Sequence, residues 1–187
     1  NKPEEITPGI ATWYASSYYD GTDYASILVK TREGRPIKIE GNKLSPATKG
    51  AVNARINSSV LSLYDSARLK NPLAKQAAAT WAELDKAIVP QLEAIAAKGG
   101  KIRILSNSII SPSTKKVIAE FAAKYPGTEH VSYDAISYSG ILKANAANYG
   151  AAIIPDYHFE NAEVIVSFGA DFLVNWLNSV EYAGQYG

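Results

Sequence analysis

The sequence predicts an α/β fold: a small, irregular N-terminal part that contains β-strands, followed by a half built on a parallel sheet. Two observations support this. Ile37 and Ile39 alternate with Lys38 and Glu40, a period of two that is typical of a half-buried strand. Beyond residue 100, short apolar runs alternate with helical patterns at the spacing of βαβ units. The second half is therefore expected to be Rossmann-like.

The N-terminal elements follow from local signals. The first 25 residues combine turn-forming residues with Trp13, Tyr14 and several further tyrosines. Aromatic side chains at this density are typical of a core edge or of a subunit contact. A strand is predicted over residues 26–31 and another over 36–42, joined by a turn in which Gly34 supplies a positive φ.

Two helices are expected next. The first covers residues 51–64, where apolar residues recur on one face. The second covers residues 81–98, with Thr80 as its N-cap, and Pro90 is expected to kink or split it. The glycine pair at 99–100 ends it.

The βαβ half begins with a strand over 101–106. A helix follows, which Ser111 caps and Pro112 opens. The remaining expected elements are a strand around 130–131, a helix over 135–148, a strand over 163–168 and a last helix over 172–182.

These elements suggest two parts. Residues 1–75 form a hairpin and helix region, and residues 76–187 form the Rossmann-like portion. The chain starts at Asn1 and contains no methionine, so we expect it to be a fragment of a longer subunit.

Composition excludes several classes of protein. The 187 residues carry 19 basic and 18 acidic side chains, a net charge of +1, which is not the footprint of a nucleic-acid binder. No apolar run approaches the length that a membrane span needs. The absence of cysteine excludes disulfides, thiolate nucleophiles and thiolate-bound iron or zinc. Residues 30–75 hold 10 basic and three acidic residues, a stretch that either faces an anionic partner or is simply solvated.

Histidine chemistry has few candidates. The chain has two histidines, His130 in an expected strand and His158 in an expected loop. Asp156 could orient His158, but no nucleophile elbow accompanies it. Asp156, His158 and Glu160 are metal-ligand types at spacing i, i+2, i+4, yet no second ligand run accompanies them. Either histidine is otherwise an ordinary polar contact.

Anion binding has one candidate. The segment from Gly169 to Asp171 is expected at a helix N-terminus, where free N–H groups favour an anion. Asp171 could instead cap that helix with its own carboxylate. The loop after the 101–106 strand has no glycine, so it is not a dinucleotide fingerprint. We assign no catalytic, cofactor-binding or metal-binding residue from the sequence.

Three blocks in the first part resemble a known family. They read GRPIKIEGN at 34–42, SPATKG at 45–50 and LYDSARLKNPL at 63–73. In this order and spacing they resemble the opening of the molybdopterin oxidoreductase superfamily. The segment FENAEVIVSFGAD at 159–171 resembles that family's next domain. The resemblance implies a molybdopterin-oxidoreductase-like fold.

The chain departs from the family at its iron–sulfur site. Family members often carry four cysteines that hold a [4Fe–4S] cluster. The aligned positions fall near Tyr18, Gly21, Ala25 and Asn53, none of which is a thiolate. We therefore expect no cluster, and no cofactor, in this chain.

A degenerate branch of the superfamily is more similar: the large iron–sulfur subunit of alternative complex III, a quinol–electron-carrier oxidoreductase of bacterial membranes. Its molybdopterin-like part carries no pterin, and its clusters lie in a C-terminal ferredoxin-like part. This resemblance implies a non-catalytic docking domain at the periplasmic face of the inner membrane. Its partners would be other subunits of a respiratory complex. The alternatives are a cofactor-binding oxidoreductase fragment and a Rossmann-like module that binds a small ligand near Asn107–Ser108 and Gly169–Asp171.

Overall fold

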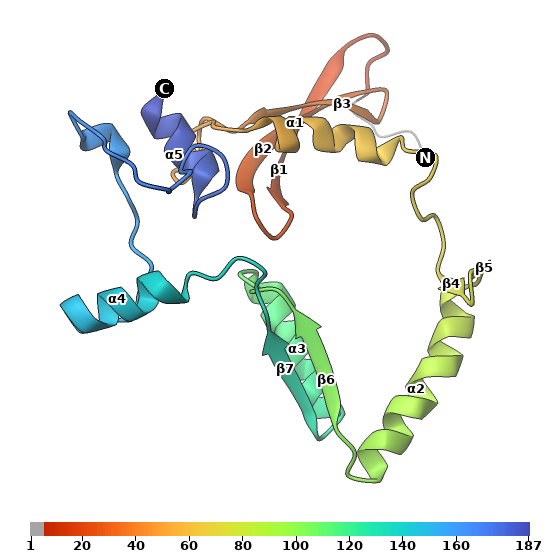
Figure 1. Ribbon diagram of the computed structural model, residues 1–187. Coiled ribbons are helices and arrows are strands. Elements are labelled where there is room, and N and C mark those ends of the chain that lie inside the picture. Colours follow the sequence, from red (N-terminus) through yellow and green to blue (C-terminus); the bar gives the residue numbers. More distant parts are fainter. Residues whose placement is uncertain (1–5) are drawn as a thin grey trace. The chain divides into compact units, whose positions relative to one another are not determined.

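The computed structural model describes residues 6–187, and Figure 1 shows their helices and strands. The chain divides into two compact units. The first unit joins the N-terminal residues up to Arg68 with Pro155–Gly187. The second unit is Leu69–Ile154. The expected division into 1–75 and 76–187 stays a prediction, and in the structure residues 155–187 pack with the first unit. Residues 1–5 of the expected first part lie outside the described residues.

The first unit contains a three-stranded antiparallel sheet in the order β1-β2-β3. Its strands are β1 (Ala11–Tyr19), β2 (Tyr24–Arg32) and β3 (Arg35–Gly41). The two predicted strands are confirmed as β2 and β3. Glu33 and Gly34 join them with φ angles of 51° and 78°, the two positive values of a type I′ turn.

Strand β1 was not predicted, because its residues were expected to be turn-rich. Its composition explains the error. The strand has no charged residue, so its sequence lacks the apolar–polar alternation that is typical of a half-buried strand. In the structure none of its residues is buried. Its tyrosine, tryptophan and threonine nevertheless favour extended backbone, and all nine residues pair with β2.

The helix expected over 51–64 is two shorter elements. A five-residue α-helix, α1 (Ala54–Ser58), runs into a 3₁₀-helix, η1 (Ser59–Leu63). The hydroxyls of Ser58, Ser59 and Ser62 each donate to the carbonyl three residues earlier. Such side-chain bonds compete with the α-helical ladder and favour the tighter turn.

The core of the first unit joins the sheet to these helices. Its buried apolar residues are Ala25, Ile27, Ile39, Ile56, Val60 and Val180. Because Val180 comes from the C-terminal helix α5 (Ser179–Tyr186), that helix belongs to the same core as the hairpin.

The C-terminal segment differs from the prediction. Residues 163–168 form no strand, and the helix expected over 172–182 begins only at Ser179. Val164 and Phe168 are 80% and 93% exposed, so the apolar run that suggested a buried strand has no sheet to join among the described residues. A short 3₁₀-helix, η2 (Phe159–Asn161), precedes it.

The second unit begins with a small hairpin, β4 (Leu73–Ala74) and β5 (Ala77–Ala78), and continues into α2 (Trp81–Ala97). The predicted cap is confirmed as a capping box: Thr80 accepts from the Glu83 amide, and the Glu83 carboxylate accepts from the Thr80 amide. Pro90 does not split the helix, which continues through it. Strong helix formers, mainly alanine and leucine, flank the proline on both sides.

A βαβ unit follows, as predicted. Strands β6 (Ile102–Ser106) and β7 (Thr128–Ser132) pair in parallel, and α3 (Pro112–Lys124) connects them (Figure 1). Ser111 caps α3 and Pro112 occupies its first turn. The last helix of the unit, α4 (Ser139–Tyr149), starts four residues later than expected. The α/β fold class is thus confirmed, with a small antiparallel sheet and a two-stranded parallel sheet. No helix within residues 6–187 has the length and apolar character of a membrane span.

Candidate functional site: a buried ion pair beside the hairpin turn

The most prominent polar site of the first unit is a buried carboxylate. Asp23 follows the turn between β1 and β2, and 1% of its surface is exposed. The Arg55 guanidinium, in the first turn of α1, holds it with two hydrogen bonds. Nε donates to Oδ2 at 2.7 Å and Nη2 donates to Oδ1 at 2.9 Å. This two-bond geometry is the strongest that arginine makes with a carboxylate.

Asn53 completes the set of bonds to Asp23. Its amide donates to Asp23 Oδ2 at 2.8 Å, while its own oxygen caps α1 by accepting from the Ile56 amide at 2.9 Å. The Asn53 side chain thus caps the start of α1 and also binds Asp23, which follows the turn between β1 and β2. The hydrogen bonds that Arg55 donates to Asp23 raise the pKa of Arg55 above its usual value.

A second carboxylate, Asp20, organises the turn. It accepts hydrogen bonds from the backbone amides of Thr22 and Asp23 and from the hydroxyl of Tyr18. Burial raises the pKa of Asp20, but these hydrogen bonds outweigh it and hold the pKa below its usual value. For Tyr18, burial and the nearby Asp20 raise the pKa of the phenol.

Arg55 also binds the C-terminal segment. Nη2 donates to the Val174 carbonyl at 2.8 Å, and Nη1 lies 3.5 Å from the side-chain oxygen of Asn175. The hydroxyl of Ser179, the first residue of α5, donates to the same Val174 carbonyl at 3.0 Å. Arg55 therefore connects three parts of the first unit: the turn between β1 and β2, α1, and the segment that leads into α5.

The four positions that align with the family's cluster ligands lie around this ion pair. Tyr18 and Ala25 are cross-strand partners, Gly21 lies in the turn between them, and Asn53 is bonded to Asp23. These residues do not fit an iron–sulfur cluster. They offer no thiolate, Ala25 is completely buried, and the amide of Asn53 already has its partners. The aligned positions thus surround an ion pair rather than a set of metal ligands.

A separate cavity of about 370 Å³ lies elsewhere in the first unit. No sequence pattern predicted it, since its walls come from residues far apart in the chain and share no local motif. Its charged and polar walls include Thr48, Lys49, Glu160, Glu181 and Gln185.

The charged groups of this cavity already have partners. Lys49 Nζ lies 3.4 Å from Glu160 Oε1. The Glu181 carboxylate accepts hydrogen bonds from the side-chain amides of Asn178 and Gln185. Burial raises the pKa of Glu181. Because the charges are satisfied by the chain itself, this arrangement is typical of a structural polar contact.

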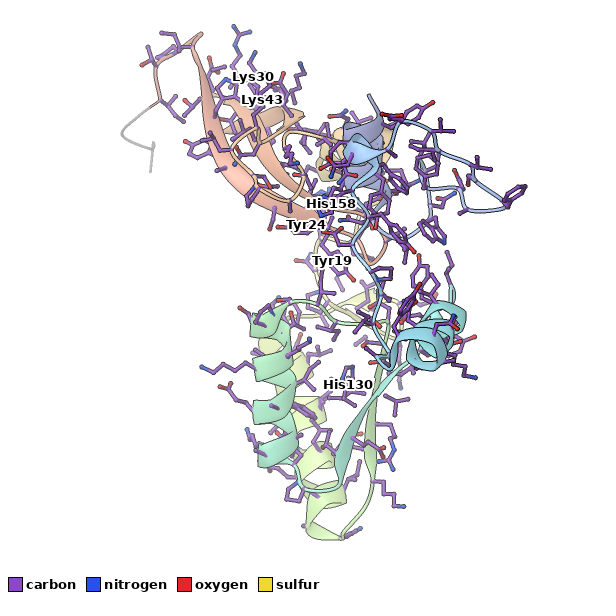
Figure 2. All side chains as sticks on the ribbon, turned by 90° about the vertical axis from the view of Figure 1, so that its left-hand side faces the viewer. Tyr19, Tyr24, Lys30, Lys43, His130 and His158 are labelled. Carbon is purple, nitrogen blue, oxygen red and sulfur yellow. The ribbon has the colours of Figure 1, made fainter. Side chains whose placement is uncertain are left out.

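The two histidines lie in different units, and Figure 2 labels both. In the second unit, His130 Nε2 lies 2.8 Å from Ser106 Oγ. Ser106 donates its only hydroxyl proton to the Asn107 carbonyl at 2.6 Å, so the histidine must donate to the serine. His130 therefore cannot act as a base toward Ser106.

In the first unit, the His158 side chain is exposed. Its Nδ1 lies 3.3 Å from Glu160 Oε1, and its Nε2 lies 3.9 Å from Asp156 Oδ2. The structure thus brings together the three ligand types that the sequence singled out. No group of three or more His, Asp or Glu side chains with a metal-binding arrangement is found within residues 6–187. The assignment of no metal residue stays a prediction.

The expected anion site at Gly169–Asp171 does not have the predicted geometry. Gly169 has the positive φ of 70° that its place in the sequence suggested. However, residues 172–175 form turns and no helix starts there, so Asp171 is not a helix cap. Its backbone carbonyl accepts from the amides of Val174, Asn175 and Trp176, and its carboxylate accepts from Asn175.

At the carboxyl end of β6, Ser108 is bound within the chain. Its backbone amide and hydroxyl both donate to the Asp134 carboxylate. These bonds hold the pKa of Asp134 below its usual value, so a negative charge already occupies the place where an anionic ligand would bind. Ser108 and Gly169 belong to different units, so the expected ligand crevice is not assembled within one of them.

Comparison with known proteins gives a distant relationship. No family model matches the chain. A search of curated proteins finds the molybdopterin-binding-like subunit of menaquinone reductase from Nitratidesulfovibrio vulgaris (strain Hildenborough), 24% identical over 166 residues. The match includes 86% of this chain and 23% of the relative, so the chain spans about a quarter of the relative's length. The chain is therefore distantly similar to a molybdopterin-binding-like reductase subunit, and assignment to alternative complex III stays a prediction.

Proposed function

We propose that this chain is a non-catalytic docking domain of a respiratory electron-transfer subunit. The observation that carries the proposal is the Asp23–Arg55 ion pair. It lies among the positions that align with the family's cluster ligands and links the hairpin, α1 and the C-terminal segment. A buried ion pair of this kind positions structural elements but does not transfer electrons.

The distant relative supports the class of assembly. It is named as a molybdopterin-binding-like subunit of a menaquinone reductase, so a place beside other subunits of a quinone-linked complex is the function we propose here. The finer proposal is the large iron–sulfur subunit of alternative complex III, on the periplasmic side of the membrane. It rests on the sequence resemblance alone. A cofactor-binding oxidoreductase fragment is the competing function, and its molybdenum content would distinguish it.

The exposed aromatic residues of β1 support docking. Trp13 and Tyr14 are 40% and 43% exposed on neighbouring positions of the strand. Aromatic side chains contribute large binding energies at interfaces because they bury much area at a small entropic cost. The part of the basic stretch that lies in the first unit, from Lys30 to Arg68, would then direct an acidic partner and act mainly on the association rate.

This proposal predicts that replacing Trp13 and Tyr14 with alanine weakens retention in the complex more than it weakens folding. The test purifies the complex through a tag on the full-length subunit and compares the yield of partner subunits with a melting curve of the variant. Trp81→Ala is the control, because Trp81 is an exposed tryptophan of the second unit. Intact retention combined with a collapsed melting temperature would show that the two aromatics stabilise the fold instead.

A further inference from the structure

Strand β1 forms one edge of the three-stranded sheet, and its composition is unusual for an edge. The nine residues Ala11–Tyr19 contain no charged side chain and no proline, and none of them is buried. Natural sheets usually protect long edges with lysine, proline, a bulge or a covering element. Among the described residues no strand pairs with the free side of β1.

The opposite edge, β3, has this protection. Pro36 removes one backbone donor there, and its carbonyl accepts from the Tyr64 hydroxyl at 2.6 Å. Lys38 and Glu40 add charges, and α1 and η1 both contact the strand. The same sheet therefore protects its β3 edge and leaves its β1 edge unprotected. The exposed edge is a specific feature of β1 and not a property of the whole sheet.

The register shows which groups of β1 face outward. The Asn42 amide donates to the Ser26 carbonyl at 2.9 Å, so Ser26 directs its backbone groups toward β3. Backbone direction alternates along an antiparallel strand, so Ile27 and Val29 face β1. Their partners, Ser16 and Tyr14, are bonded to β2.

The alternate residues of β1 therefore direct their amides and carbonyls away from the sheet. These residues are Trp13, Ala15 and Ser17. They present three donors and three acceptors in the spacing of a β-ladder, which is the arrangement that an added strand needs.

We infer that the free edge of β1 binds an extended segment of a partner subunit, which adds a fourth strand to the sheet and carries an acidic side chain where it passes Trp13. This inference rests on the proposed docking function and specifies its mode. Backbone bonds to Trp13, Ala15 and Ser17 would hold the segment, and the exposed aromatic side chains would pack against it.

The charges at the two ends of β1 determine which segment fits. Lys30 lies opposite Trp13 and holds its ammonium 5.4 Å from the centre of the indole, which brings the charge toward the free edge. Lys30 makes no ion pair with any residue in 6–187 that the structure describes. At the other end, Asp20 is already bonded to Tyr18 and to two backbone amides. The unpaired charge is thus the positive one, which favours an acidic partner.

The test is amide-resolved hydrogen exchange of the full-length subunit, alone and in its purified complex. In the subunit alone, the amides of Tyr14 and Ser16 should be protected and those of Trp13, Ala15 and Ser17 should exchange freely. In the complex, the outward amides should slow by at least about tenfold. If the subunit is retained in the complex and these amides stay fast, the inference fails while the docking function stands. If no complex is retained, both fail.

Two further outcomes complete the design. Protection of the outward amides in a dimer of the subunit alone would overturn the inference in favour of a second copy of the chain. Lys30→Glu should slow association with the partner by about tenfold at low salt. Lys86→Glu, at an exposed lysine of α2 in the second unit and outside the basic stretch, is the matched control. Equal effects of the two substitutions would contradict an acidic segment at Trp13.

Discussion

The Asp23 carboxylate lies almost entirely out of contact with water, and its hydrogen bonds to Arg55 and Asn53 compensate for that loss. Removing one member of such a pair leaves a charge without its partner, and this is more costly than replacing both. Asp23→Ala should therefore lower the free energy of unfolding by about 3 kcal/mol, measured by urea denaturation. The value is at the lower end for a buried pair because the Arg55 side chain is 42% exposed and can regain water.

The matched control is an ion pair at the surface of the same unit. Lys38 and Glu40 are bonded to each other, but both side chains are well exposed. Glu40→Ala should cost less than about 1 kcal/mol, since an exposed pair gains little over its hydrated charges. Similar costs for the two substitutions would mean that Asp23 is not the organising residue of this unit.

Tyr182 provides a test by pH. It is 1% exposed, and burial raises the pKa of its phenol from 10.0 to about 12. Between these pH values the unfolded chain loses this proton while the folded chain keeps it, so the free energy of unfolding falls as pH rises from 10 to about 12. Below pH 10 the contribution is fully present.

Tyr182→Phe removes this one proton, so its free energy of unfolding should fall less steeply over the same pH range. Urea denaturation at several pH values measures the difference between the two slopes. Tyr149→Phe, at a tyrosine that is 80% exposed, controls for the loss of a hydroxyl. Parallel curves for wild type and Tyr182→Phe would show that the buried phenol does not contribute to the pH dependence.

At the scale of elements, α5 depends on one close approach. A Cβ on Gly184 would lie 2.7 Å from the Cβ of Ala51, closer than two such atoms come in real proteins. Alanine usually stabilises a helix relative to glycine by about 1 kcal/mol. Here the overlap should outweigh that gain, so Gly184→Ala should destabilise the first unit by about 1–2 kcal/mol.

Gly140, in α4, provides a control of opposite sign. A Cβ there would meet no atom within 4 Å, so Gly140→Ala should raise stability by up to about 1 kcal/mol. Thermal melts followed by circular dichroism measure both variants. A stabilising effect at both positions would mean that α5 can move away from Ala51 without cost.

Some elements follow from local sequence signals, and others depend on pairing with distant residues. Thr80 with Glu83, and Ser111 with Pro112, are local signals, and the structure confirms both helix starts. The run at 163–168 resembled a buried strand, but a strand forms only where a neighbouring strand can pair with it, and this is not a local property. Strand β1 was missed for the converse reason, because its pairing with β2 supplies what its own pattern lacks.

The candidate site was only partly predictable. The four aligned positions were identified by resemblance, and the structure places them around one turn. The ion pair that they surround joins residues 32 positions apart, and no local pattern links an aspartate after a turn to an arginine in a helix. The cavity beside Lys49 and the bond from Arg55 to Val174 depend on the return of the C-terminal segment, which the expected division at residue 75 did not include.

At the scale of the whole molecule, both units expose many apolar side chains. In the second unit, the described helices contain no buried residue, and Leu105 and Val117 are exposed. Parallel sheets are normally covered on both faces. This surface is consistent with a chain that spans about a quarter of its relative's length and whose proposed role is to contact other polypeptides.

The central claim, that this domain docks and does not catalyse, is tested most directly by the molybdenum content of the full-length subunit purified in its complex. The account predicts molybdenum well below one atom per subunit, together with full retention of the partner subunits. Stoichiometric molybdenum that stays with the subunit through purification would contradict it and would favour a cofactor-binding oxidoreductase.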